Sequence, residues 1–298
     1  MSAGPITFAI PYYSGLAYLE KTIESVLAQT DSEWIAVVCD DSPTAEARDT
    51  VERAGRGRVR YAPNERNLGM AANFNRCIDI ADTDLVTVLH ADDLLAPAYT
   101  ELVRNAATRH PDAAAIYCGI DVIGADGGPA FSLPHAVKRR LDPAFRHEAV
   151  LDGEPGVRAL LRGNFIPAAS LCFRKSVLGT RRFVARYKFV LDWDLTLGML
   201  LDGHPLVGLP AHLLQNRAHA EATTEKLTRS HTRFTEEIEL YRDMADIART
   251  RGWDRCVAVA EHRYLTKLHV LYRALRGLAR FDLADAKHGW QLLRMGSR

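Results

Sequence analysis

Residues 86–97 read VTVLHADDLLAP, and they join an apolar run to a histidine and two adjacent aspartates. The apolar run is typical of a buried strand, and Pro97 is a residue that fits the first turn of a helix. Adjacent carboxylates at the end of a buried strand repel each other, so another interaction must offset their cost. A divalent cation that prefers oxygen ligands provides one such interaction. Alternatively, Asp93 caps the helix that begins near Pro97.

The first 120 residues alternate between apolar runs and segments in which apolar residues recur at helical spacing. Strands are predicted at residues 6–11, 33–41, 58–63, 84–90 and 113–119. Helices are predicted between them, at residues 16–29, 44–54, 69–81 and 97–110. Apolar strands that alternate with helices indicate an α/β fold, with a mainly parallel sheet covered by helices on both faces.

Polar residues follow the predicted strands, at residues 11–14, 40–42, 64–69 and 90–93. Because ligands bind at the carboxyl ends of the strands in such sheets, we expect these four groups to lie together at one edge. A carboxylate after the second strand, Asp40 or Asp41, is suited to accept hydrogen bonds from a nucleobase or a ribose. In the purely structural alternative, Ser42 caps the following helix.

Beyond residue 119 the regular alternation stops. The pattern predicts a hairpin at 121–128, a long loop at 129–154, a short helix at 154–163, a strand at 166–173, a helix at 189–204 and one or two strands at 205–220. Only helices are predicted from residue 224 onward. We therefore divide the chain into a domain of residues 1–222, with halves 1–119 and 120–222, and a C-terminal helical region of residues 223–298.

The composition is that of a globular protein, with 47% hydrophobic and 25% charged residues in a chain of 298. A formal net charge of +1 gives no indication of a nucleic-acid partner. The five cysteines form no CxxC pair and are odd in number, which favours a reducing, cytoplasmic setting over a disulfide framework. No signal peptide or bilayer-spanning run is recognisable, so we expect a soluble protein or one peripheral to the inner face of the membrane.

The chain from residue 6 to residue 119 resembles the nucleotide-binding half of family 2 glycosyltransferases, which have the GT-A fold. The matching pieces are, in order, ITFAIPYYS, LEKTIESVLAQT, VVCDDS, NERNLGMAANFN and LHADDLLAPAY. The resemblance implies a metal-dependent, inverting transfer of a sugar from a nucleotide-sugar donor to an acceptor hydroxyl. It favours a UDP-sugar as donor and Mn²⁺ or Mg²⁺ as cofactor. A glycan, a glycolipid or a natural product remains open as acceptor.

The resemblance also assigns residues to the nucleotide site. Pro11 and Tyr13 match residues that line this site in the family. Asp41 matches the carboxylate that hydrogen-bonds the base. Asn67 and Asn73, in the run NLGMAAN, match residues beside the nucleotide.

Asp92 matches the last aspartate of the family's DxD motif, which holds the metal on the diphosphate. His90 takes the place of the first aspartate, and a neutral imidazole can still donate a hydrogen bond to a ribose or sugar hydroxyl. We assign Asp93 to the same site, either at the nucleotide or in support of the metal. In QNRAHAEATT, which resembles a Tyr-Arg-x-His segment of the family, His219 is a candidate second metal ligand or an ordinary loop histidine. Arg217 could pair with phosphate oxygens or with a surface carboxylate.

The segment FVARYKFVLDWDLTLGMLLDG resembles the family's acidic pair before a helix. Asp192 matches the catalytic base, and Leu191 replaces the usual glutamate. Inverting transfer requires such a base, because the acceptor hydroxyl must lose its proton as it attacks the anomeric carbon. The alternatives are that Asp192 only caps its own helix, or that Asp194 is the base.

The last fifty residues, 249–298, contain eleven lysines and arginines but four aspartates and glutamates. Leucines recur there at helical spacing, with arginines between them. Three interpretations of this tail remain open: an apolar stripe that packs on the rest of the protein, a surface that docks on an anionic membrane, or a surface that joins copies of the chain.

Two other functions remain open from the sequence. A sugar-1-phosphate nucleotidyltransferase also uses a parallel sheet and carboxylate-bound Mg²⁺. However, PYYSGLAYLEK lacks the Gly-rich, basic phosphate loop that usually follows the first strand of such enzymes. A non-catalytic nucleotide-sugar-binding relative would have lost its base and metal ligands, whereas Asp92 and Asp192 are both present.

Overall fold

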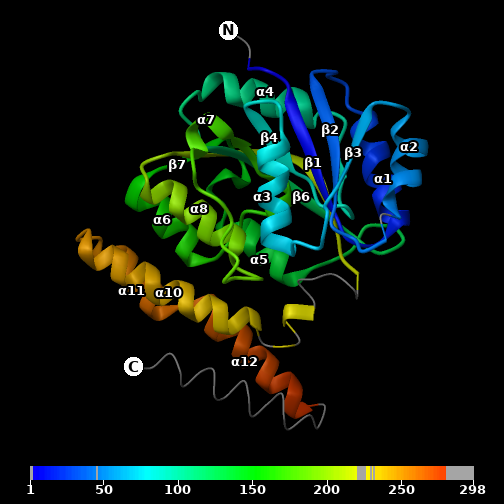
Figure 1. Ribbon diagram of the computed structural model, residues 1–298. Helices are drawn as coiled ribbons and strands as arrows, with labels where there is room; N and C mark the ends of the chain where they lie inside the picture. The colour runs from blue at the N-terminus through cyan, green and yellow to red at the C-terminus, as the bar shows by residue number, and fades with distance from the viewer. Residues whose placement is uncertain (1–2, 45, 220–225, 229, 231, 280–298) are drawn as a thin grey trace.

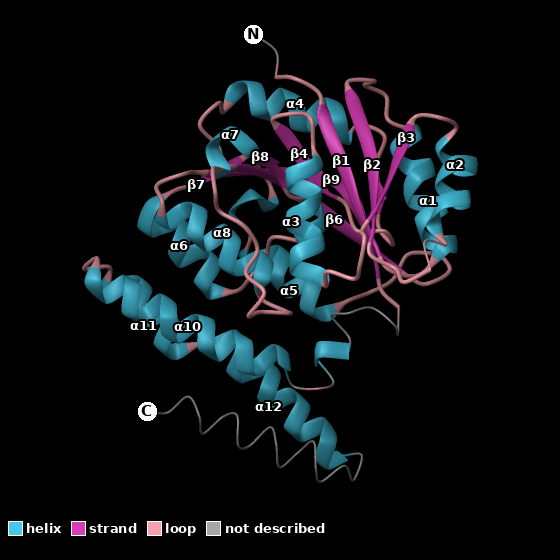
Figure 2. Cartoon of the chain, in the orientation of Figure 1, coloured by secondary structure: helices cyan, strands magenta, loops and turns pink. Residues whose placement is uncertain are grey.

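The computed structural model describes residues 3–44, 46–219, 226–228, 230 and 232–279. The described strands form one nine-stranded sheet in the order β3-β2-β1-β4-β8-β6-β9-β5, with β7 beside β9. Helices cover both faces of this sheet, and the helices α10 to α12 lie together at one end of the molecule (Figures 1 and 2). The predicted α/β class is confirmed.

The half of the sheet built from the first ninety residues is parallel. β1 (Ile6–Tyr12) pairs in parallel with β2 (Trp34–Asp40) and β4 (Leu85–Val88), and β2 pairs in parallel with β3 (Val59–Pro63). These strands follow the apolar runs of the sequence, as strands buried on both faces require. The predicted helices are also present, as α1 (Leu16–Leu27), α2 (Ala47–Gly55), α3 (Met70–Ile80) and α4 (Tyr99–Arg109).

The other half of the sheet is mixed. β8 (Cys172–Arg174) lies antiparallel between β4 and β6 (Ala115–Ile123). β6 pairs in parallel with β9 (Leu206–Arg217), which also pairs antiparallel with two short strands, β5 (Leu94–Leu95) and β7 (Ala149–Leu151). Through β5, the end of β9 reaches residues 90–93, which we call the HADD turn.

The prediction of a long loop at residues 129–154 is wrong. This segment contains α5 (Leu133–Leu141), a 3-10 helix (Pro143–Phe145) and β7. α5 begins where the Ser132 hydroxyl accepts a hydrogen bond from the His135 amide at 3.4 Å. No residue of α5 is fully buried. A helix that buries no face shows no apolar stripe in its sequence, and periodicity therefore missed it.

The strand predicted at 166–173 is wrong for most of its length, because Ala168–Ser170 form a 3-10 helix and only the last two residues belong to the short β8. Pro167 precedes that turn, and its ring removes an amide that a longer ladder would need. The other helices of this half are α6 (Gly153–Arg162), α7 (Lys175–Leu178) and α8 (Leu191–Leu201), and the predictions for α6 and α8 are confirmed.

The C-terminal region is helical as far as it is described, with α10 (Thr232–Thr250), α11 (Asp254–His262) and α12 (Tyr264–Ala279). The rest of the predicted helical tail, residues 280–298, lies outside the described residues. α10 and α11 do not merely touch the sheet domain. Leu240, Tyr241 and Cys256 belong to the same buried core as the apolar residues of α6 and α8.

All five cysteines are buried, and none of them forms a disulfide bond. Within the described part of the chain, no helix combines the length and the apolar composition that crossing a bilayer requires.

Candidate active site

The carboxylate of Asp41, directly after β2, organises the nucleotide side of the site. It accepts hydrogen bonds from the backbone amides of Leu68 (2.7 Å) and Gly69 (2.9 Å) and from the side-chain amide of Asn64 (2.7 Å). These bonds hold the loop after β3 against the end of β2. A carboxylate has about four acceptor positions, so Asp41 retains capacity for one more donor.

The two asparagines of the NLGMAAN run have different surroundings. Asn67 donates from its side chain to the Asp41 carbonyl at 3.0 Å and is exposed enough to meet a ligand. Asn73 is buried, where it donates to the Cys39 carbonyl (3.2 Å) and accepts from Asn64 (3.0 Å). Asn73 therefore ties α3 to β2 in this structure, and Asn67 is the better candidate for direct contact with a nucleotide.

Pro11 and Tyr13 lie at the carboxyl end of β1. Pro11 is partly exposed, and the Tyr13 side chain is 58% exposed. Tyr12 between them is fully buried and donates its hydroxyl proton to Glu46 at 2.8 Å. Alternate residues of a strand point to opposite sides, so Pro11 and Tyr13 are left for a ligand at this edge.

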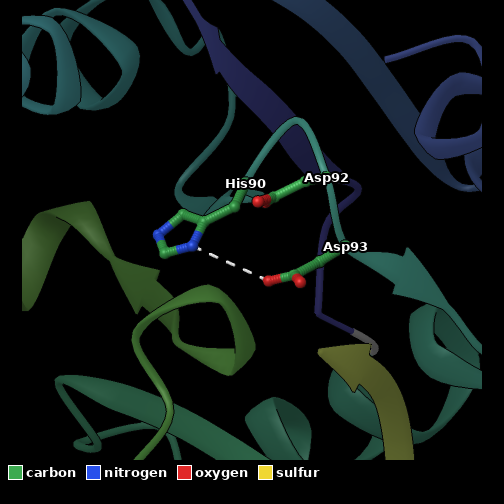
Figure 3. Close-up of side chains that lie close together, drawn as sticks. All are labelled: His90, Asp92 and Asp93. Carbon is green, nitrogen blue, oxygen red and sulfur yellow. Dashed lines mark ion pairs between the residues drawn. The ribbon is translucent and has the colours of Figure 1, made fainter. Parts of the chain in front are cut away.

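Three potential ligand atoms converge in the HADD turn between β4 and β5. One atom each from His90, Asp92 and Asp93 lie within 4.8 Å of one another, and Figure 3 shows the His90 ring turned toward Asp93. His90 Nδ1 lies 3.7 Å from Asp93 Oδ2. The other side of the imidazole stacks on Phe74 of α3, with ring centroids 5.5 Å apart. This stacking joins the HADD turn to the helix that carries Asn73.

Asp93 is completely buried and holds the turn in place. Its carboxylate accepts from the Arg217 amide (2.9 Å) and the Asn216 side chain (3.0 Å), and its carbonyl accepts from the Thr22 hydroxyl (2.8 Å). Burial, and then the charge of Asp92, raises the pKa of Asp93 well above its ordinary value. Its role in this structure is to fasten the turn to β9 and α1, because no atom of its side chain is exposed to a nucleotide.

Asp92 and His219 lie side by side although 127 positions separate them. His219 Nε2 is 2.9 Å from Asp92 Oδ2, and the two side chains are 13% and 32% exposed. Arg217 is buried and donates from Nε to the Asp92 carbonyl at 2.9 Å, with its guanidinium over the Tyr18 ring. Arg217 thus fixes the turn through its backbone, and its side-chain partners are the carbonyls of Asp92 and Gly124 in place of the predicted surface carboxylate.

The chemistry of these donors fits a divalent metal. Asp92 offers a carboxylate, and His219 and His90 offer imidazole nitrogens, whereas the Asp93 oxygens already accept hydrogen bonds. Mg²⁺ in proteins is held mainly by oxygen, and mixed nitrogen and oxygen donors suit a transition metal such as Mn²⁺ better. The residues whose potential ligand atoms all lie within 4.8 Å of one another are His90, Asp92 and Asp93, and His219 adds a contact to Asp92.

Asp192 lies in the first turn of α8 and is partly buried. Its Oδ2 accepts a hydrogen bond from the Asn164 side chain at 3.2 Å. Burial raises the pKa of Asp192, while the positive charge of Lys138 and the bond from Asn164 act in the opposite direction. The pKa of His90 is lowered by burial and raised by the charges of Asp92 and Asp192. The charge of Asp192 is thus one of those that raise the pKa of His90.

Asp194 faces a different part of the protein. Burial raises its pKa, and the charges that lower it come from Arg186 and Arg181. Two residues on a helix differ by about 200° in direction, so Asp192 and Asp194 cannot face the same site. Leu191, which stands where the family usually has a glutamate, is buried in the core.

Asn164 and Lys138 near Asp192 are functional candidates that the sequence did not indicate. Asn164 follows a helix-ending glycine and belongs to no motif, and Lys138 lies in the segment predicted as a loop. Long-range packing alone brings them to Asp192. No local pattern in the sequence identifies either residue.

A partly parallel sheet with helices on both faces, and a potential metal site in a turn at its edge, are the features expected of a GT-A-type glycosyltransferase. The model of Glycosyl transferase family 2 matches residues 7–165, more than half of the chain, and the chain belongs to this family. The GT-A fold and the glycosyltransferase class predicted from the sequence are thereby confirmed.

Individual relatives are similar over part of their length. The uncharacterized protein MT1568 of Mycobacterium tuberculosis is 33% identical over 92 residues, 31% of this chain and 29% of that protein. The UDP-Glc:alpha-D-GlcNAc-diphosphoundecaprenol beta-1,3-glucosyltransferase WfgD of Escherichia coli is 28% identical over 89 residues, 30% of this chain and 35% of that protein. The matched regions thus span about a third of either relative.

Among solved structures, residues 1–349 of S. aureus TarS in complex with UDP-GlcNAc superpose on this chain with a TM-score of 0.59 at 13% identity. The match covers 98% of this chain and 92% of that one. At this level of identity the similarity establishes the fold.

Proposed function

We propose that this protein transfers a sugar, with inversion, from a nucleotide-sugar donor, most simply a UDP-sugar, to an acceptor hydroxyl. The observation that carries the proposal is the group of potential metal ligands in the HADD turn, where His219 lies 2.9 Å from Asp92, in a chain that belongs to a glycosyltransferase family. A base and a diphosphate-binding turn at one sheet edge are what such a transfer needs.

The nucleotide side supports a donor of this class. Tyr13 offers an exposed ring, Asn67 an amide, and Asp41 a remaining acceptor position at the end of β2. The complex of the similarly folded TarS with UDP-GlcNAc supports a uridine nucleotide at this edge. We expect the ribose or the transferred sugar to lie beside His90, next to Asp92.

In the transfer, Asp192 accepts the proton of the acceptor hydroxyl as its oxygen attacks the anomeric carbon. The bond from that carbon to the diphosphate oxygen breaks, and the nucleoside diphosphate leaves from the opposite face, which inverts the configuration. The raised pKa of Asp192 makes it a stronger base than an exposed carboxylate. Asp92 and His219 would hold a Mn²⁺ ion, which neutralises charge on the leaving diphosphate.

We further propose that the acceptor is a glycan or glycolipid hydroxyl. This inference draws on the E. coli relative, whose name specifies a sugar carried on diphosphoundecaprenol. We expect the acceptor to bind at the same edge of the sheet, against α5, α8 and the chain between them.

The direct test replaces Asp192 by Asn and, as a matched control, Asp194 by Asn. Donor-dependent release of UDP should fall by about 10²- to 10⁴-fold in Asp192→Asn, the usual contribution of a general base, and UDP affinity should be unchanged. Asp194→Asn should lose little activity, because that carboxylate faces Arg181 and Arg186. An Asp192→Asn enzyme with normal turnover would falsify the assignment of the base.

The same assays separate the alternative functions. Pyrophosphate released from a nucleoside triphosphate and a sugar-1-phosphate would identify a nucleotidyltransferase. Binding of UDP-sugars without turnover, with any acceptor supplied, would identify a non-catalytic relative.

A further inference from the structure

A carboxylate from the C-terminal helical region holds the turn that leads into α8. Glu236 of α10 accepts hydrogen bonds from three consecutive backbone amides. The distances are 3.0 Å from Lys188 N to each carboxylate oxygen, 2.7 Å from Phe189 N and 3.3 Å from Val190 N. One side chain thereby satisfies the amides immediately before the helix that carries Asp192.

The contact is enclosed and electrostatically favourable. Glu236 is only 7% exposed, so water competes little for its oxygens. Successive backbone amides that converge on one point form a natural anion site, and the positive end of the α8 dipole adds to it. Val190 lies two positions before Asp192, which leaves no flexible segment between the bound turn and the base.

Other contacts of α10 lie on both sides of this turn. Before it, the Tyr187 hydroxyl donates to Asp243 at 3.4 Å. After it, the Trp193 ring packs edge-on against Tyr241, with centroids 5.2 Å apart. The segment 187–193 is therefore held along α10, with the Glu236 carboxylate at its middle.

We propose that Glu236 is a positioning residue for catalysis: by holding the amides of residues 188–190, it sets the place of Asp192 relative to the HADD turn. The inference rests on the proposed role of Asp192 as base. It gives the C-terminal helical region a part in the reaction, although none of its residues needs to touch the substrate.

The chain offers a matched control in the neighbouring residue. Glu237 is also buried, at 5% exposure, but its carboxylate accepts from Arg233 (2.8 Å) and Thr266 (2.6 Å), both within the C-terminal helices. Removing either glutamate leaves buried donors without an acceptor. Of the two glutamates, Glu236 accepts the hydrogen bonds of residues 188–190, whereas Glu237 reaches this turn only through Arg233, whose guanidinium lies 4.6 Å from the Phe189 ring centroid. A glutamine at position 237 keeps an oxygen that can accept from Arg233.

The experiment compares Glu236→Gln, Glu236→Ala and Glu237→Gln in the full chain. It measures kcat, donor KM, thermal midpoint and amide hydrogen exchange at residues 188–190. We expect Glu236→Gln to accelerate exchange at these amides and to lower kcat about tenfold or more, as a displaced catalytic group would. Glu236→Ala should lose more, because glutamine keeps one acceptor oxygen. The KM for the donor should equal that of the wild type, because these substitutions do not contact the nucleotide side.

Glu237→Gln should lower the thermal midpoint while kcat and exchange at 188–190 stay as in the wild type. Equal losses of kcat in the Glu236 and Glu237 variants would show a general effect on stability and overturn the inference. So would faster exchange at 188–190 with unchanged kcat. The proposed function is tested separately: if Asp192→Asn is inactive while Glu236→Ala is fully active, only the positioning role fails.

Discussion

His90 gives the HADD turn a side chain that is held in place before any ligand binds. Its ring stacks on Phe74 and its Nδ1 points toward Asp93, so the imidazole has a defined direction. An aspartate at this position would bring a third carboxylate next to Asp92 and Asp93 and increase the repulsion among them. The histidine lowers the negative charge of the turn and adds a nitrogen donor, of the kind that suits a transition metal such as Mn²⁺.

Asp92 and Asp93 are adjacent in the sequence, but we expect their replacement by alanine to have different effects. Asp92→Ala removes the carboxylate beside His219 and should abolish Mn²⁺-dependent UDP binding, with little change in stability. Asp93→Ala leaves the Asn216 and Arg217 donors buried without an acceptor and should cost about 1–3 kcal/mol of stability. Calorimetric titration of UDP with and without Mn²⁺, together with denaturant unfolding, measures both. Similar effects of the two variants on binding would contradict this division of roles.

The charge of Lys138 should affect the pH at which kcat/KM rises on the acidic side of the pH profile. Burial raises the pKa of Asp192, and the Lys138 cation holds it back; the pKa of Lys138 is itself lowered to about 8 by burial and Arg233. The base works ionised, so activity rises with pH through the Asp192 pKa. Lys138→Met should move that rise in kcat/KM to higher pH, whereas Lys188→Met, at an exposed position, should leave it in place. A rise that stays in place or moves to lower pH in Lys138→Met contradicts the prediction.

The same shift has a stability consequence of defined sign. A carboxyl whose pKa is raised by folding is favoured in its protonated form, so it costs stability as pH rises from its ordinary pKa through its folded pKa. At neutral pH the ionised Asp192 carboxylate therefore lowers the free energy of unfolding, and replacing it by Asn should remove that loss. In the pH series above, the thermal midpoint of Asp192→Asn should exceed that of the wild type near pH 8 and converge with it in acid.

At the scale of elements, the sequence predicted those parts of the fold whose local pattern matches their burial. β1, β2 and β4 are apolar throughout and α1 has an apolar stripe, so periodicity found them. α5 buries no residue, and β5 and β8 are two and three residues long, so their sequences carry almost no signal. These elements depend on β9 and the sheet around them, which no local pattern encodes.

The site shows the same division. Residues at strand ends, such as Asp41 and Asp92, could be predicted because the α/β pattern fixes where strand ends lie. Asn164, Lys138 and Glu236 could not, because each reaches the α8 region only through tertiary packing. Glu236 in particular has the sequence character of a solvent-facing helical glutamate, and only its burial reveals that it holds another helix.

At the scale of the whole molecule, the described part of α12 has one buried and one exposed set of apolar residues: Val270 packs against Phe234 and Ile238 of α10. Tyr264, Leu268, Tyr272 and Leu275 recur at helical spacing and are 53–72% exposed, so this stripe does not pack on the rest of the described protein. A contiguous exposed apolar stripe of this kind marks an association surface. The packing interpretation therefore holds for Val270, and docking on an anionic membrane and self-association remain open for the exposed stripe.

We expect the full chain to associate through this stripe, and the two partners are distinguishable. Co-sedimentation with vesicles containing phosphatidylglycerol, but not with phosphatidylcholine alone, would identify membrane docking. A mass that rises with protein concentration in light scattering would identify self-association. The double variant Leu268→Ser with Tyr272→Ser should abolish the association at unchanged thermal midpoint, since both side chains are exposed. A wild-type protein that stays monomeric and ignores both vesicles would contradict the expectation.

The hydrogen bonds from residues 64–69 to Asp41 have a thermodynamic consequence for donor binding. The loop after β3 is already fixed by Asp41 through the amides of Leu68 and Gly69, so a nucleotide need not order it. Ordering a loop on binding consumes part of the interaction free energy, and a site built in advance avoids that loss. Nucleotide affinity in this protein should therefore depend on the contacts themselves, with little entropy lost from the backbone of the nucleotide side.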